Sequence, residues 1–306
     1  MQCDFQQTLL EYMSDVVGRC MLSNLSDQGI DNIARCMTQI DPYNNCGHLQ
    51  AALRLAGGSG SAREILAHQL WCVVRDAKWC MGSLQRQPLQ DSVNIEGAEW
   101  FRETIGSPTI ILAPMMLGTV DAVYSAQAAL QRLAPNRPCL FYGEEMETLF
   151  LRLPDLRQAF AQPGRRLLHQ ILQTLEQSGV FMTYPDFVYQ GHRALDVEMF
   201  GVPRGLSTSF ASICSRPGTQ ILPALQTRSE DGISIRFFEP FTLDSSAITS
   251  EEKNLQQRVC AQLLTTVLES LICQAPSQWL LLGTLTSEAP QMAMQNNMNA
   301  ANVHSS

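Results

Sequence analysis

Apolar residues recur at helical spacing through the first part of the chain. Between residues 4 and 88, side chains such as Leu9, Met13, Val16 and Val17 stand three or four positions apart. This spacing places them on one face of an α-helix, and no β-rich run interrupts it. Residues 1–90 are therefore predicted to form a helical N-terminal region.

The pattern changes after residue 90. Short apolar runs rich in β-branched and aromatic residues alternate there with helical stretches, which is typical of a sheet covered by helices. We predict an α/β fold for residues 91–285, with a central mixed sheet flanked by helices. The runs expected to form strands are Thr109–Leu112, Cys139–Tyr142, Val180–Met182, Gln220–Leu222 and Ile233–Phe237.

A long helix is predicted near the end of this region. Thr249 and Glu252 have the spacing of a capping box, which marks a helix start, and an apolar stripe follows through which the helix is expected to pack. Residues 286–306 have no charge pattern and no aromatic anchor, so we expect them to be disordered. The stripe consists of Leu255, Val259, Leu263, Val267 and Leu271.

Composition narrows the possible partners. The 306 residues are 45% hydrophobic, enough for a sizeable core, and carry 21 basic against 29 acidic residues, for a net charge of -8. That sign disfavours nucleic acid and anionic membranes. No apolar run reaches the ~18 residues of a membrane span, and the start has no signal-peptide pattern. We expect a soluble cytoplasmic protein without stable membrane insertion.

The ten cysteines are scattered singly, without a Cys-x-x-Cys pair. Such spacing favours reduced, structural cysteines over a zinc site or a disulfide framework. We therefore expect neither a metal nor another cofactor.

Several blocks of the chain carry a family likeness. Asn94–Gly97 followed by Ile110–Asp121 is similar to the segment of the bacterial lipid A (lauroyl/myristoyl-type) acyltransferases in which a strand delivers a His-x-x-x-x-Asp/Glu motif. The likeness covers residues 48–285 and implies a glycerol-phosphate-acyltransferase-like α/β fold. The further blocks, in family order, are Gly179–Asp186, Met199–Pro203 with Ser207 and Thr208, Ile221–Ala224, Phe238–Pro240 and Pro276–Leu280.

The resemblance implies a catalytic pair that is incomplete in this chain. In the family the histidine acts as general base towards an acceptor hydroxyl or amine, and the carboxylate orients it. Asp121 and Gly118 match the motif, but Met116 stands at the position of the histidine. A thioether accepts no proton near neutral pH. The inherited mechanism should lose the ~10²–10⁴-fold contribution of a general base unless another group replaces it.

Other residues are candidates for that replacement. His192 follows the Gly179–Asp186 block and is a candidate relocated base, working with Asp121 or Asp186; the alternative is a solvated loop histidine. Cys139 and Cys214 are weaker candidates for a thioester nucleophile, because no partner base is visible. Asp121 without its histidine is equally consistent with a first-turn residue that stabilises a helix N-terminus.

Substrate contacts are expected from Gly118 and Asp186, and from Arg193 and Arg204. The two guanidinium groups suit the phosphate of phosphopantetheine or coenzyme A. Ordinary surface charge is the more frequent role of such arginines.

These observations favour a soluble acyltransferase-like enzyme. It would transfer an acyl group from an acyl carrier protein or acyl-CoA thioester to a small or carrier-bound acceptor. The alternative is a non-catalytic family member that binds a partner or an acyl-loaded carrier. An open tunnel reaching Asp121, with His192 within hydrogen-bond reach, would favour the enzyme, and a site filled by apolar side chains would favour the binding protein.

Overall fold

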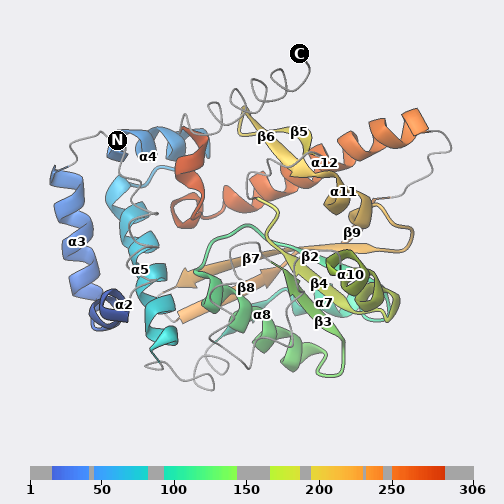
Figure 1. Cartoon of the computed structure of the whole chain (residues 1–306), viewed down its shortest axis with the longest axis horizontal. Helices are drawn as coiled ribbons and strands as arrows, with labels where there is room; N and C mark the ends of the chain where they lie inside the picture. The colour runs from blue at the N-terminus through green and yellow to red at the C-terminus, as the bar shows by residue number, and fades with distance from the viewer. Residues whose placement is uncertain are drawn as a thin grey trace, which may run out of the picture.

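A seven-stranded mixed sheet lies at the centre of the described structure (Figure 1). The computed structural model describes residues 16–40, 45–81, 93–142, 166–186, 194–229, 232–243 and 250–286. The strands of this sheet are β1 (Asn94–Glu96), β2 (Thr109–Leu112), β3 (Cys139–Tyr142), β4 (Val180–Thr183), β7 (Gln220–Ser229), β8 (Gly232–Phe237) and β9 (Phe241–Thr242).

The strand order is β1-β8-β7-β2-β4-β3, with β9 paired to β7. β7, β2, β4 and β3 are parallel to one another, whereas β8 is antiparallel to β7. Because parallel strands end at the same edge of a sheet, the segments that follow β2 and β4 meet there. The predicted mixed sheet and its five strand positions are confirmed, and β1 and β9 are added.

Both faces of the sheet are covered. Ile111 belongs to one buried cluster, with side chains of α5, α7 and α8, whereas Ile110 and Leu112 belong to a second, with side chains of α10, α11 and α12. A strand buried on both faces reads as an unbroken apolar run. The covering helices are α5 (Ala62–Cys80), α7 (Ala98–Glu103), α8 (Thr119–Leu133), α10 (Leu167–Glu176), α11 (Thr208–Cys214) and α12 (Ser250–Ile272).

The described residues before the sheet are helical, as predicted. α5 begins with a capping box, in which Ser61 Oγ accepts from Glu64 N and the Glu64 carboxylate accepts from Ser61 N. Figure 1 shows α5 beside the end of β7. The helices that precede α5 are α2 (Val16–Ser23), α3 (Asp27–Ile40) and α4 (Asn45–Leu55).

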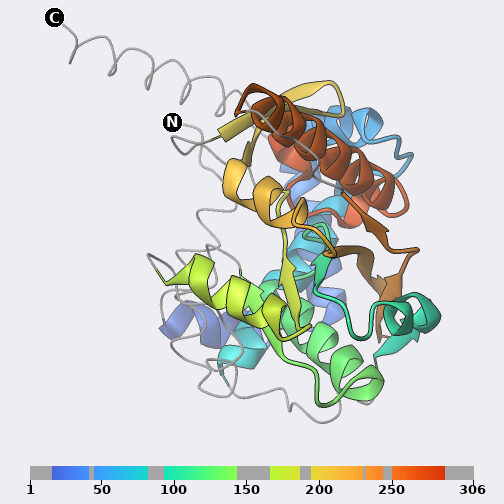
Figure 2. The same cartoon turned by 90° about the vertical axis from the view of Figure 1, so that its right-hand side faces the viewer.

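A separate hairpin was not predicted. β5 (Ala194–Met199) pairs antiparallel with β6 (Val202–Ser207). The Gln262 side chain of α12 binds this hairpin at Glu198. Glu198 N donates to Gln262 Oε1 at 2.9 Å, and Gln262 Nε2 donates to the Glu198 carbonyl at 2.8 Å. Figure 2 shows the hairpin against α12. After α12 the described chain ends in two short 3-10 helices, η3 (Pro276–Gln278) and η4 (Leu282–Leu285).

The long C-terminal helix is present, but the predicted packing stripe is wrong. Leu255 is 65% exposed and Leu263 48%, whereas Leu271 is 2% exposed. Residues four apart on a helix are rotated about 40° from one another around its axis. The first residues of the stripe therefore face solvent, and the last one faces the core. Thr249 and residues 287–306, including the tail expected to be disordered, lie outside the described residues. The side chains of α12 that are buried are Cys260, Ala261, Leu264, Thr265, Leu268, Leu271 and Ile272.

None of the helices in the described ranges combines the length and apolar content that crossing a bilayer requires.

Adjacent leucines of α12 test this packing. Leu264 is fully buried and Leu263 is not, so Leu264→Ala should lower the free energy of unfolding by about 3 kcal/mol through the cavity it leaves. Leu263→Ala, the matched control, should change it by less than ~0.5 kcal/mol. Urea denaturation measures both. Similar losses for the two variants would contradict the assigned face.

Candidate functional site

The turn that carries the family-like motif joins β2 to α8 at the carboxyl edge of the sheet. Met116 in this turn is 1% exposed and packs in the second buried cluster. Asp121 lies in the first turn of α8 and is fully buried. Met116 and Asp121 thus lie around one turn after β2, in agreement with the likeness to a motif delivered by a strand.

Asp121 already has strong partners. Arg75 of α5 donates to both carboxylate oxygens, Nε to Oδ2 at 2.7 Å and Nη2 to Oδ1 at 2.9 Å. Trp79 Nε1, one helical turn further along α5, donates to Oδ1 at 2.9 Å. A bidentate guanidinium and an indole N–H compensate a buried carboxylate well. Within the described residues, no imidazole donates a hydrogen bond to Asp121.

The N-terminus of α8 is also occupied. Val120 N donates to Asp76 Oδ1 at 3.1 Å, so a carboxylate from α5 lies where a helix start attracts anions. A Cβ at Gly118 would stand 2.9 Å from Asp76 Oδ2. Gly118 therefore makes room for Asp76. Its expected contact with substrate remains a prediction.

A histidine that sequence reasoning passed over lies beside Met116. His68 Nε2 donates to the Met116 carbonyl at 2.7 Å and lies 3.5 Å from Cys72 Sγ. Burial lowers the pKa of His68 to about 4, against the raising effect of its backbone bonds to Met116 and Gln278, so the ring is neutral at pH 7. The spacing of His68, Cys72 and Asp76, four residues apart on α5, was the available signal.

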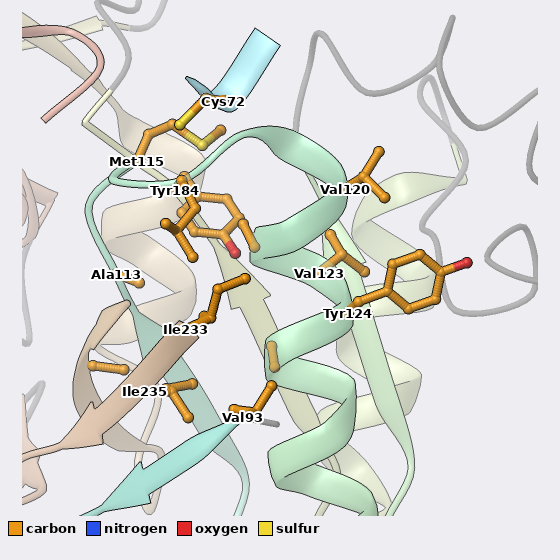
Figure 3. Packing of buried hydrophobic residues seen from close by; sticks show 14 of the residues in the cluster. Cys72, Val93, Ala113, Met115, Val120, Val123, Tyr124, Tyr184, Ile233 and Ile235 are labelled. Carbon is orange, nitrogen blue, oxygen red and sulfur yellow. The ribbon is translucent and has the colours of Figure 1, made fainter. Parts of the chain in front are cut away.

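Two family-like blocks meet at the same turn. Asp186, which follows β4, accepts on Oδ2 from Met115 N at 2.9 Å and from Trp279 Nε1 at 2.7 Å. Leu280 N donates to the Met115 carbonyl at 3.0 Å. Figure 3 shows Met115 near Cys72 and Tyr184, within the buried cluster that they share. The blocks around residues 184–186 and 276–280 thus hold both backbone groups of Met115.

Arg204 is buried, which excludes the alternative of ordinary surface charge, and its expected contact with substrate stays a prediction. Nη1 donates to the Asp186 carbonyl at 3.2 Å, Nη2 donates to Thr284 Oγ1, and the guanidinium lies over the Trp279 ring at 5.3 Å. On β6, Arg204 points to the same face of the hairpin as the buried Leu206 two residues on, since alternate residues of a strand share a face. His192 and Arg193 lie outside the described residues.

The candidate thiols are poorly suited to nucleophilic chemistry. Burial raises the pKa of Cys139 and of Cys214, which keeps both protonated at neutral pH. In the part of the chain that the structure describes, no group of three or more His, Cys, Asp or Glu side chains is arranged to hold a metal ion.

Breaking the Arg75–Asp121 pair should destabilise the fold, because one buried charge would lose its partner. Asp121→Asn removes the charge that compensates Arg75 and should lower the free energy of unfolding by about 3 kcal/mol. Asp31→Asn is the matched control, because Asp31 makes a similar bidentate contact with Arg63 but is 37% exposed. Its effect should be much smaller. Equal losses in urea denaturation would show that burial of the pair is unimportant.

His68 should give the protein a measurable acid sensitivity. Its pKa is about 4 when folded against 6.5 for an ordinary histidine, so the unfolded chain binds the proton more tightly. As pH falls from 6.5 to 4, the wild type should lose about 3 kcal/mol relative to His68→Gln. Exposed His169, changed to Gln, is the control. Parallel stability–pH curves for wild type and His68→Gln would contradict this.

A comparison with known protein families finds a match that includes the later residues of this site. The model of the family described as bacterial lipid A biosynthesis acyltransferase matches residues 152–285. No curated protein matches the chain. The matched range contains Asp186, Arg204 and Trp279, whereas the turn with Met116 and Asp121 precedes it. The match supports a general acyltransferase role. Residues 152–285 thus relate this chain to the bacterial lipid A biosynthesis acyltransferase family, as its ordered sequence blocks predicted.

Proposed function

We propose that this chain transfers an acyl group from an acyl carrier protein or acyl-CoA thioester to a small or carrier-bound acceptor. The observation that carries the proposal is the convergence of separate family-like blocks on one turn. Asp186 and Leu280 bind the two backbone groups of Met115, although they are far apart in sequence. The framework that positions a reaction centre in an acyltransferase would then be retained, while one of its residues has changed.

Such an enzyme would not use Met116 and Asp121 as base and orienting carboxylate. Met116 has no basic group, and Asp121 is engaged by Arg75 and Trp79. An amine acceptor needs less help in losing a proton than a hydroxyl does, so an amine is the favoured acceptor class. His192 remains a candidate base, and Arg193 and Gly118 remain candidate substrate contacts.

A specific observation favours the second candidate, a non-catalytic protein that binds a partner or an acyl-loaded carrier. Residues of α5 bind the polar groups of the motif turn. Arg75 binds Asp121, Asp76 accepts from the start of α8, and His68 donates to the Met116 carbonyl. A turn closed in this way supports packing and recognition as readily as catalysis.

Thioester turnover separates the two candidates. Wild-type protein is given octanoyl-CoA, or an octanoylated carrier protein, with hydroxylamine as acceptor, and octanoyl hydroxamate is measured above the uncatalysed rate. The enzyme should turn over, and Met116→Ala should reduce the rate by less than the ~10²–10⁴-fold expected for loss of a general base. His192→Ala should cost that larger factor only if His192 is the base.

Met116→His provides the complementary experiment. A silent wild type whose Met116→His variant forms hydroxamate would support the non-catalytic candidate, because one imidazole would have restored the reaction. Wild-type turnover that Met116→His leaves unchanged or lowers would exclude that candidate.

A further inference from the structure

Two oppositely charged side chains near the motif turn each keep one buried polar atom without a partner. Among the described residues, Asp186 Oδ1 and Arg204 Nε are the buried side-chain atoms that make no hydrogen bond. Asp186 is 2% exposed and Arg204 4%. Buried polar atoms are nearly always hydrogen-bonded, so an exception calls for an explanation, and a functional role is one.

The rest of each side chain is firmly held. Asp186 Oδ2 accepts from Met115 N and Trp279 Nε1, so the direction of the carboxylate is fixed by its other oxygen. Arg204 is fixed through Nη1 and Nη2, by the Asp186 carbonyl and Thr284, and lies against the Trp279 ring. The unpartnered atoms therefore have defined positions. Preorganised groups of this kind are what a reaction centre needs.

Their chemistry is complementary. An ionised carboxylate oxygen accepts a proton, whereas a guanidinium N–H donates a hydrogen bond and keeps its own proton. Burial raises the pKa of Asp186 against the lowering effect of Met115 N and Trp279 Nε1, and a carboxylate with a raised pKa is the stronger base. Arg204 remains a cation at neutral pH, although burial lowers its pKa to about 10.

We infer that Asp186 Oδ1 is the proton acceptor, and Arg204 Nε the carbonyl-binding donor, of acyl transfer to an amine. The inference rests on the proposed function. The acceptor nitrogen bonds to the thioester carbonyl carbon while Arg204 Nε donates to the carbonyl oxygen. Asp186 takes the N–H proton, the C–S bond breaks, and the proton passes to the departing sulfur. The products are an amide and a thiol, and Asp186 is again a carboxylate.

Asp186→Asn tests the base with little change in structure. The amide oxygen can accept from Met115 N and Trp279 Nε1, but the amide nitrogen at the place of Oδ1 cannot take a proton. With octanoyl-CoA and hydroxylamine, kcat should fall ~10²-fold or more, while the melting temperature stays within about 4 °C of the wild type. Asp196→Asn, the same change at an exposed residue of β5, should leave kcat unchanged.

The pH profile distinguishes a base from a merely structural carboxylate. The wild-type kcat should rise with pH through the raised pKa of Asp186, and Asp186→Asn should lack this limb. The titratable or charged groups whose influence bears on Asp186 are Arg204 and Tyr184. Both keep their protons at neutral pH, since the pKa of Arg204 is about 10 and burial raises the pKa of Tyr184. Arg204→Lys keeps a cation but loses Nε, and should cost kcat about 10²-fold.

Each result decides the matter. A large loss in Asp186→Asn, with the pH limb removed and stability retained, supports the inference. Wild-type turnover that Asp186→Asn reduces less than tenfold overturns the inference and leaves the proposed function standing. No wild-type turnover with octanoyl-CoA or the octanoylated carrier protein overturns both.

Discussion

A carboxylate can remain charged in the core only if a cation and hydrogen-bond donors reach it, and for Asp121 both come from α5. Arg75 and Trp79 hold the carboxylate, and the same helix places Asp76 at the start of α8 and His68 on the Met116 carbonyl. Because these contacts fix α5, the turn and α8 relative to one another, the position of the helical N-terminal region depends on them. Removing a buried ion's partner costs several kcal/mol, so this arrangement resists rearrangement.

Sequence patterns predicted the strands well because each one is a short apolar run between polar breaks, as in Thr109–Leu112. They failed where tertiary contacts decide the outcome. In the hairpin Ala194–Ser207 the charged residues Asp196, Glu198 and Arg204 interrupt the apolar residues. The hairpin is stabilised by Gln262 of α12, a helix far away in the sequence. The stripe of α12 failed because a strict four-residue spacing does not keep to one face of a helix.

The location of the candidate site was predicted in part. The turn after β2 followed from the likeness to a known motif, and the structure places Asp186, another residue singled out from the sequence, beside that turn. The partners of Asp121 were missed, because Arg75 and Trp79 precede it by more than forty residues and carry no motif of their own. Arg204 was expected to contact substrate, with surface charge as the alternative, and its burial was missed because sequence alone does not reveal which face of a short hairpin meets the core.

The two carboxylates near the motif turn differ in the kind of partner that holds them. Asp121 is bound on both oxygens and balanced by the Arg75 guanidinium, so neither of its oxygens is without a partner. Asp186 is held on one oxygen by two neutral N–H groups, and its other oxygen is unengaged. Of the two, only Asp186 combines a fixed direction with an oxygen that makes no hydrogen bond. If chemistry persists beside a methionine that cannot take a proton, Asp186 is the better placed carboxylate to support it, although the family likeness did not assign this residue as catalytic.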